Sequence, residues 1–174
     1  AYTQTNIRLE EIEGITTGNG TLLQGIIGDI LRNVPVGFAH HKTAMPCYTL
    51  DKAFEEFDLY EKDGELLGQL DAGYFQIGTL GGGNHFIEVQ VDDEGYLGIM
   101  IHSGSRHFGK SVCDYFHTKA RELNRRWYSD VPDEYRLAFL PTDSKEGRAY
   151  LNWMNLCLEF ARENREKMML SVKS

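Results

Sequence analysis

The sequence has few cysteines and no long apolar run. Only three of its 174 residues are cysteine, Cys47, Cys113 and Cys157. This small, odd and widely spaced set argues against a disulfide framework and indicates free thiols in a reducing compartment, so we expect a cytoplasmic protein. No apolar stretch approaches the roughly 20 residues of a membrane-spanning helix. The first dozen residues are polar and acidic and show no secretory signal. We therefore expect no membrane partner.

Basic charge is also in short supply. The chain has 18 lysines and arginines against 26 aspartates and glutamates, a formal net charge of −8. A protein that coats nucleic acid needs a basic surface, and this balance argues against that class. A negative net charge is still compatible with a local basic site, and it suits a metal enzyme equally well.

Apolar periodicity predicts a chain that mixes strands and helices. In chain order the sequence predicts a strand over residues 1–8, a turn over 14–20, a helix over 22–31 that stops before Pro35, a helix over 51–60, a turn at 63–64, strands over 85–91 and 96–102, and helices over 111–128 and 144–169. An acidic turn joins the two later strands into a hairpin. Cys113 and Cys157 fall in helical patterns, where we expect both to be buried.

Two glycine-rich stretches each carry a histidine where a turn meets a strand. The first, residues 78–88, reads GTLGGGNHFIE, and the second, residues 99–109, reads IMIHSGSRHFG. Consecutive glycines allow positive φ and let a ligand approach bare main chain. The adjoining strand fixes a side chain at a defined place. We expect the hairpin to bring His85 and His102 into one sheet.

His85 and His102 are candidate metal ligands, because neutral imidazole is a common ligand and two on neighbouring strands can converge on one cation. Histidine ligation alone fits zinc as well as manganese. The alternative is that each packs in the core or in a loop. His40 and His41 are adjacent and would point to opposite faces of a strand, so we interpret them as residues of a solvated loop.

Three residues around His85 suit a nucleotide. The Asn84 amide can contact a phosphate oxygen or a metal-bound water, although asparagine also suits a left-handed turn. Phe86 and Glu88 lie two apart, so in a strand they share a face opposite His85. An aromatic plane with a carboxylate can read guanine, and core packing is the alternative for Phe86.

The second stretch has the composition of an anion site. Residues 103–109 offer backbone N–H groups and hydroxyls near the expected start of a helix. Helix N-termini and the guanidinium of Arg106 both favour phosphate.

These stretches resemble the RtcB family of RNA ligases. Family members carry a G-G-G-N-H-F-x-E block followed by an H-S-G-S-R block, and both stand here intact, at residues 81–88 and 102–106. Shorter similarities at residues 34–37 and 160–165 extend the resemblance over nearly the whole chain. It implies an α+β fold in which a mixed sheet, with a hairpin carrying both motif histidines, packs against several helices.

The resemblance also implies a chemistry. RtcB ligases join an RNA 3′-phosphate or 2′,3′-cyclic phosphate to a 5′-hydroxyl, in tRNA splicing and RNA repair. They use GTP and manganese and pass through a covalent histidine–guanylate. By resemblance, the metal ligands are His85 and His102, one on each of two adjacent ions; the GTP-binding residues are Asn84, Phe86 and Glu88; and the residues acting on phosphates in catalysis are Asn84 and Arg106. His107 and Phe108 stand where the family has small or aliphatic residues, which bears on the shape of the RNA pocket.

Other parts of the family site do not occur in the sequence. These are the D-x-G-C-G-M block with its bridging cysteine, the H-N block and the histidine that is guanylylated. The chain begins at Ala1 without methionine and ends after a helical pattern. We therefore expect residues 1–174 to be a single segment of a larger RtcB-like catalytic domain, inactive in isolation. Two alternatives stay open: a zinc-dependent hydrolase that uses both histidines and a further carboxylate, and a catalytically incomplete module that binds RNA or a nucleotide.

Overall fold

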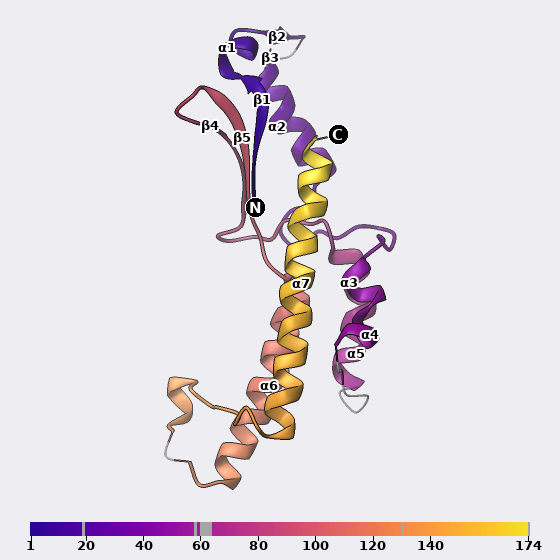
Figure 1. Cartoon of the computed structure of the whole chain (residues 1–174), viewed down its shortest axis with the longest axis vertical. Coiled ribbons are helices and arrows are strands. Elements are labelled where there is room, and N and C mark those ends of the chain that lie inside the picture. The colour runs from indigo at the N-terminus through magenta and orange to yellow at the C-terminus, as the bar shows by residue number, and fades with distance from the viewer. Residues whose placement is uncertain (19, 58, 60–63, 130, 174) are drawn as a thin grey trace.

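The computed structural model describes residues 1–173 apart from residues 19, 58, 60–63 and 130. The turn expected at Asp63 and the end of the helix expected over 51–60 therefore lie outside the described residues. The elements in chain order are β1 (Tyr2–Arg8), α1 (Leu9–Ile12), β2 (Thr16–Thr17), β3 (Gly20–Thr21), α2 (Leu22–Asn33), α3 (Tyr48–Asp51), α4 (Ala53–Glu56), α5 (Gly64–Gln76), β4 (Phe86–Val91), β5 (Tyr96–His102), α6 (Arg106–Arg126), the 3-10 turn η1 (Asp133–Tyr135) and α7 (Lys145–Lys173). The fold is α+β, with small antiparallel sheets packed against helices (Figure 1).

The main sheet has three strands in the order β1-β5-β4. Both pairings are antiparallel, β4 with β5 through the turn at residues 92–95 and β1 with β5 on the other side. The expectation of a mixed sheet is therefore wrong for the described strands. The reason is that β5 is central, so β1 and β4 run in the same direction but never become neighbours.

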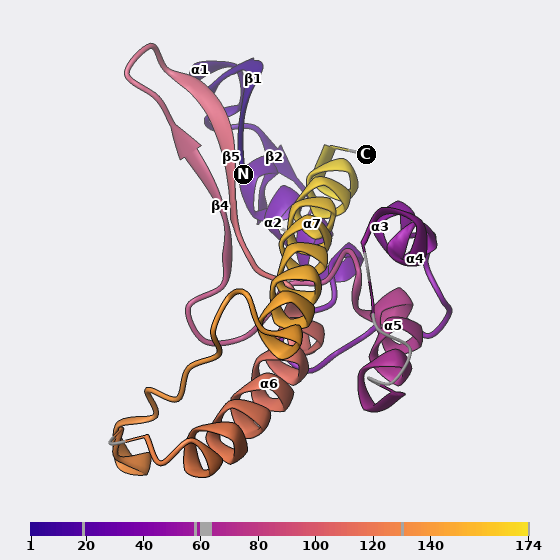
Figure 2. The ribbon, with the colours of Figure 1, turned by 60° about the horizontal axis from the view of Figure 1, so that its bottom comes forward.

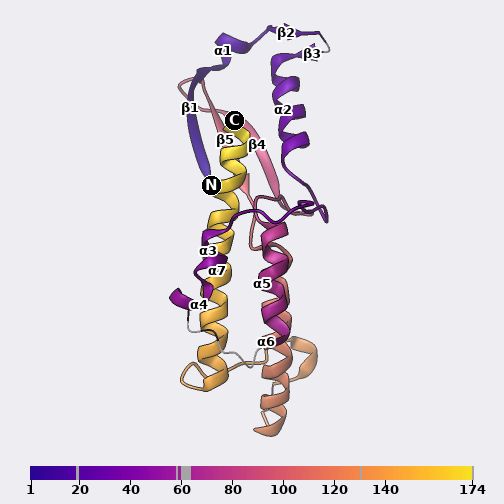
Figure 3. The same ribbon diagram turned by 90° about the vertical axis from the view of Figure 1, so that its right-hand side faces the viewer.

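The C-terminal half of α7 packs against the sheet (Figures 1 and 3). Ile99 and Ile101 of β5 are buried with Met168 and Met169 of α7, and Val34 closes the same cluster. Alternate residues of β5 thus point into the molecule, which leaves His102 on the other side, at the strand end.

The second core lies where α5, α6 and α7 pack together (Figure 2). Phe108 is fully buried and meets Trp153 and Phe160 with ring centroids 6.3 and 5.3 Å away. Because Phe108 lies one helical turn before the buried Val112, the helix starts at Arg106 and not at residue 111 as predicted. The apolar stripe of α6 therefore begins at Phe108, before the start of the predicted helix.

Other expectations also needed correction. Cys113 is exposed, because it neighbours Val112 on α6 but lies off the buried stripe, whereas Cys47 and Cys157 are buried. The helix expected over 51–60 is replaced by α3 and α4, with a break at Lys52. The helix α5 was not predicted, because its glycines weaken the helical signal. Gly73 allows α5 to approach Leu50 closely, since a Cβ at this position would lie 2.7 Å from Leu50 Cδ1.

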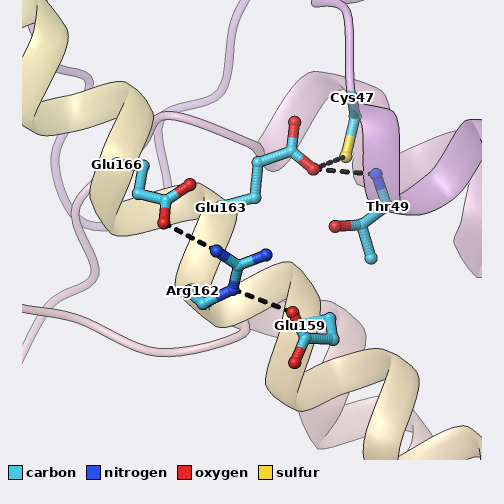
Figure 4. Close-up of polar contacts among 6 residues, drawn as sticks. All are labelled: Cys47, Thr49, Glu159, Arg162, Glu163 and Glu166. Carbon is cyan, nitrogen blue, oxygen red and sulfur yellow. Dashed lines mark hydrogen bonds and ion pairs between the residues drawn. The ribbon is translucent and has the colours of Figure 1, made fainter.

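Glu163 of α7 holds the start of α3 (Figure 4). Its carboxylate accepts hydrogen bonds from Tyr48 N at 3.0 Å, Thr49 N at 2.8 Å and the Cys47 thiol at 3.4 Å. Burial alone would raise the pKa of Glu163, but these hydrogen bonds outweigh it and hold the pKa below its ordinary value.

Candidate functional site

The two motif histidines lie together at one end of the hairpin. His102 is the last residue of β5, and His85 directly precedes β4. Their ring centroids are 5.9 Å apart. Phe86 pairs with His102 across the strands, and the two rings stack with centroids 5.4 Å apart and planes 18° from parallel. One imidazole therefore lies against both a second imidazole and an aromatic ring.

We expected the candidate metal ligand His85 to lie on the opposite face of the strand from Phe86 and Glu88, the candidate guanine-binding residues, and the arrangement differs from this. Phe86 and Glu88 do share a face of β4, but the register of the pair puts His102 on that face too. His85 precedes the strand, so strand alternation does not govern where its ring lies. Glu88 is exposed and accepts a hydrogen bond from Gln90 Nε2 at 2.8 Å. A candidate metal ligand thus adjoins the candidate base-binding residues.

His85 has one buried ring nitrogen, Nδ1, without a hydrogen-bond partner in the described structure. Burial lowers the pKa of His85 most, the charges of Arg106 and His102 lower it further, and the nearby Gly82 carbonyl offsets part of this. The neutral imidazole is the form that binds a metal.

Gly81 allows His85 and Arg106 to approach one another. A Cβ on Gly81 would lie 1.8 Å from His85 Nδ1 and 2.6 Å from Arg106 Nη1. The absence of a side chain at Gly81 therefore lets His85 and Arg106 pack against the glycine backbone. Positive φ is used two residues later, at Gly83, with φ 70°.

Arg106 begins α6 with φ 59°, a left-handed conformation that costs a non-glycine residue about 1–2 kcal/mol. Its Nε donates to Thr79 Oγ1 at 2.8 Å and its Nη2 to the Gly37 carbonyl at 2.6 Å. Burial lowers the pKa of Arg106. Neither partner is a carboxylate, and across the described part of the chain Arg106 has no ion pair. The guanidinium is therefore positioned by neutral groups, and its charge is not paired with a carboxylate among the described residues.

Asn84 is exposed in the loop between Gly83 and His85. It does not have the positive φ that the alternative of a left-handed turn requires. Among the described residues its amide makes no hydrogen bond, so it is available to a ligand.

His40 and His41 lie between α2 and α3, in the loop whose Gly37 carbonyl accepts a hydrogen bond from Arg106. His40 is largely exposed. The pKa of His40 is nevertheless lowered, first by partial desolvation and then by the charges of Arg106, His107 and His41. His41 is partly buried, and its Nε2 atom has no hydrogen-bond partner in the described structure. The expectation of a solvated loop therefore holds for His40 and is too simple for His41.

The described residues do not form a complete metal site by themselves. Across the described ranges no group of three or more histidine, cysteine or acidic side chains is placed to hold a metal ion. His85 and His102 can contribute two ligands, and a complete site would need others. The contacts of Arg106 with Thr79 and Gly37 had no signal in the residue pattern, because they join segments that are distant in sequence.

Comparison with known proteins identifies the family. The family model described as tRNA-splicing ligase RtcB matches residues 3–174. The chain belongs to the RtcB family. Its relatives include tRNA-splicing ligase RtcB of Nanoarchaeum equitans, 29% identical over 98% of this chain and 42% of that protein. The RtcB proteins of Methanopyrus kandleri and Mycobacterium tuberculosis are 36% and 37% identical, each over 56% of this chain, and over 12% and 26% of their own lengths.

The family match extends over residues 3–174 and so includes all residues of this site. The chain spans less than half the length of each of these RtcB relatives. No helix in the described ranges has the length and apolar character needed to cross a membrane.

Proposed function

We propose that this chain forms part of a cytoplasmic RNA ligase of the RtcB type. The reaction joins an RNA 3′-phosphate or 2′,3′-cyclic phosphate end to a 5′-hydroxyl end, with GTP and manganese, in tRNA splicing or RNA repair. The observation that carries the proposal is the convergence of His85, His102 and Arg106, in which an imidazole nitrogen is buried without a partner and a desolvated guanidinium has no carboxylate.

His85 and His102 are the residues of this chain that would hold manganese. The donor set fits in kind, since both are imidazoles and His85 is favoured in its neutral form. A bound divalent ion would neutralise charge on a triphosphate. The further ligands and the guanylylated histidine are expected outside these 174 residues.

Phe86, Glu88 and Asn84 form the proposed nucleotide side of the site. Phe86 is 41% exposed, enough for its ring to take part in stacking with a base. Glu88 is exposed on the same face, where its carboxylate can accept from the ring N–H and exocyclic amine of guanine. Asn84, with an unengaged amide, would contact phosphate.

Arg106 would hold the phosphate of the RNA end. A half-desolvated guanidinium binds an anion more strongly than one in water, because the effective dielectric is lower. This local cation also explains how an acidic chain can bind RNA. Orienting the phosphate requires no proton transfer by Arg106, since a guanidinium stays protonated.

A manganese titration tests the metal assignment on the chain itself. Paramagnetic broadening of histidine ring signals in NMR detects weak binding, which we expect here because only two ligands are present. His85 and His102 should broaden together, and His85→Ala should abolish the effect at His102. His117, on α6, is the control. Equal broadening of all three would show non-specific binding and refute the site.

The ligase assignment needs a protein that joins this segment to the remaining parts of an RtcB domain. With GTP, Mn²⁺ and a 3′-phosphate/5′-hydroxyl RNA pair, it should form a guanylate adduct and ligate, and His85→Ala or His102→Ala should abolish ligation. The isolated 174 residues should do neither. Cleavage of the RNA would favour the hydrolase alternative, and binding without adduct would favour the binding module.

A further inference from the structure

Asn164 of α7 is fully buried between the two loops that carry the site. Its Oδ1 accepts hydrogen bonds from Gly78 N at 2.7 Å and Thr79 N at 3.1 Å. Its Nδ2 shares two N–H groups among three acceptors, the Thr79 carbonyl at 3.2 Å, Ser103 Oγ at 3.3 Å and the Gly104 carbonyl at 3.1 Å. One side chain thus bonds both the glycine loop before His85 and the turn after His102.

We propose that Asn164 is a positioning residue that sets the two histidine-bearing loops at their working separation. The proposal rests on the function proposed above, because the groups that Asn164 positions are those assigned there to metal and phosphate. Asn164 itself lies behind the loops and touches neither proposed ligand.

The requirement is for an amide. The glycine loop presents two N–H donors, and the other partners include two carbonyls that need a donor. Asparagine carries an acceptor and a donor on one short side chain, whereas aspartate only accepts when ionised. The partners also fix the orientation of the amide, because its oxygen must face the N–H groups.

A chain of bonds carries this position to Arg106. Asn164 bonds both the backbone N–H and the backbone carbonyl of Thr79. The Thr79 hydroxyl accepts a hydrogen bond from Arg106 Nε at 2.8 Å and donates one to the Gln76 carbonyl at 2.6 Å. Gln76 in turn accepts from Phe108 N at 3.2 Å. The conformation of the first turn of α6 therefore depends on the glycine loop, and the glycine loop depends on Asn164.

Arg165 supports the same turn from the next position of α7. Its Nη1 donates to the Ser103 carbonyl at 3.1 Å. Two consecutive residues of α7 thus bond the turn that follows His102, and only Asn164 also bonds the glycine loop. This difference makes Asn164 the residue whose loss should change the separation of the loops.

The test compares Asn164→Asp and Asn164→Ala with Glu163→Gln. Glu163 is the matched control, because it neighbours Asn164 on α7 and bonds backbone N–H groups, but those of Tyr48 and Thr49. The readouts are the ring signals of His85 and His102, the Arg106 Nε–H signal, and the Mn²⁺ concentration that broadens the rings. If Asn164 only stabilised the fold, all three variants would be less stable, and the His85, His102 and Arg106 signals would not shift more in the Asn164 variants than in Glu163→Gln.

We expect Asn164→Asp to shift His102 more than His85, since it keeps the acceptor half, and Asn164→Ala to shift both. Both should weaken Mn²⁺ broadening by about 10- to 100-fold, and Glu163→Gln should not. Folded Asn164 variants with wild-type ring signals would overturn the proposal.

A variant at Thr79, the residue that links Asn164 to Arg106, keeps the proposal testable if neither Asn164 variant folds. Thr79→Val keeps the volume and the backbone bonds to Asn164 but removes the acceptor of Arg106 Nε. It should shift the Arg106 Nε–H and His85 signals and spare His102, and an unchanged Arg106 signal would overturn the proposal. If Mn²⁺ broadens no ring in the wild type while the Asn164 shifts occur, the metal role fails and the positioning role stands.

Discussion

Replacing Gly81 with alanine should damage the site more than the fold. The new Cβ would lie 1.8 Å from His85 Nδ1 and 2.6 Å from Arg106 Nη1, so both side chains must move. The ring has to shift by about 1 Å, a misplacement that can lower a catalysed rate about 100-fold. The stability cost should be small, because flexible side-chain ends yield and alanine restricts the unfolded chain by about 0.4–1 kcal/mol.

Gly95→Ala is the opposite case in the same hairpin. Gly95 has φ 86° in the turn at the far end from His85, and a Cβ there would meet nothing within 4 Å. Alanine in this left-handed conformation should cost about 1–2 kcal/mol of unfolding free energy. It leaves the strand ends that carry His85 and His102 in place. The two variants should therefore separate stability from site geometry.

Urea unfolding and histidine ring NMR on each variant measure the two effects, with RNA ligation measured in the complete domain. We expect Gly81→Ala to unfold within about 1 kcal/mol of the wild type, with displaced His85 signals and weaker Mn²⁺ broadening. Gly95→Ala should unfold more easily and keep both site readouts. Wild-type His85 signals in Gly81→Ala would refute the packing of His85 and Arg106 on the glycine backbone.

Three further predictions concern other groups. Glu163→Gln should lower the unfolding free energy by about 1–3 kcal/mol at neutral pH. Because the pKa of Glu163 is held below its ordinary value, this stabilisation is present above about pH 4.3 and is lost as the pH falls toward the folded-state pKa. A difference in unfolding free energy between the wild type and Glu163→Gln that is the same at every pH would contradict this prediction. Cys113 should react with a thiol reagent in the native state, whereas burial raises the pKa of Cys47 and Cys157 to about 12 and both should react only on unfolding, as mass spectrometry can show. Arg106→Gln should remove the shifts that inorganic phosphate causes in the His85 ring signals, and persistent shifts would place the anion elsewhere.

Local pattern accounts for the elements that the sequence predicted well. The helix over 22–31 has an apolar stripe, a Thr21 N-cap that accepts from Gln24 N at 3.2 Å, and Pro35 after its end. The strand over 96–102 is a mostly apolar run that lies between the acidic turn at residues 92–95 and Gly104. Such signals lie within a few residues of the element that they define.

The remaining features depend on contacts between distant segments. The start of α6 is set by Phe108 against Trp153 and Phe160, and the stacking of Phe86 on His102 by the strand register. The predicted hairpin brought His85 and His102 together, but neither resemblance nor periodicity indicated that Phe86 would stack on His102. The left-handed φ of Arg106 had no local signal, because arginine is not a residue that favours it.

The strain and desolvation at Arg106 are best understood together. A partly buried guanidinium in a chain with 26 acidic residues could be neutralised by a carboxylate, yet in the described structure it is bonded only to Thr79 and the Gly37 carbonyl. Neutral acceptors orient a cation without cancelling its charge, whereas a carboxylate would compete with an incoming phosphate. The buried network of Thr79 and Asn164 therefore holds Arg106 in a left-handed conformation that is unfavourable by itself, and under the proposed function an incoming phosphate would be the partner of its charge.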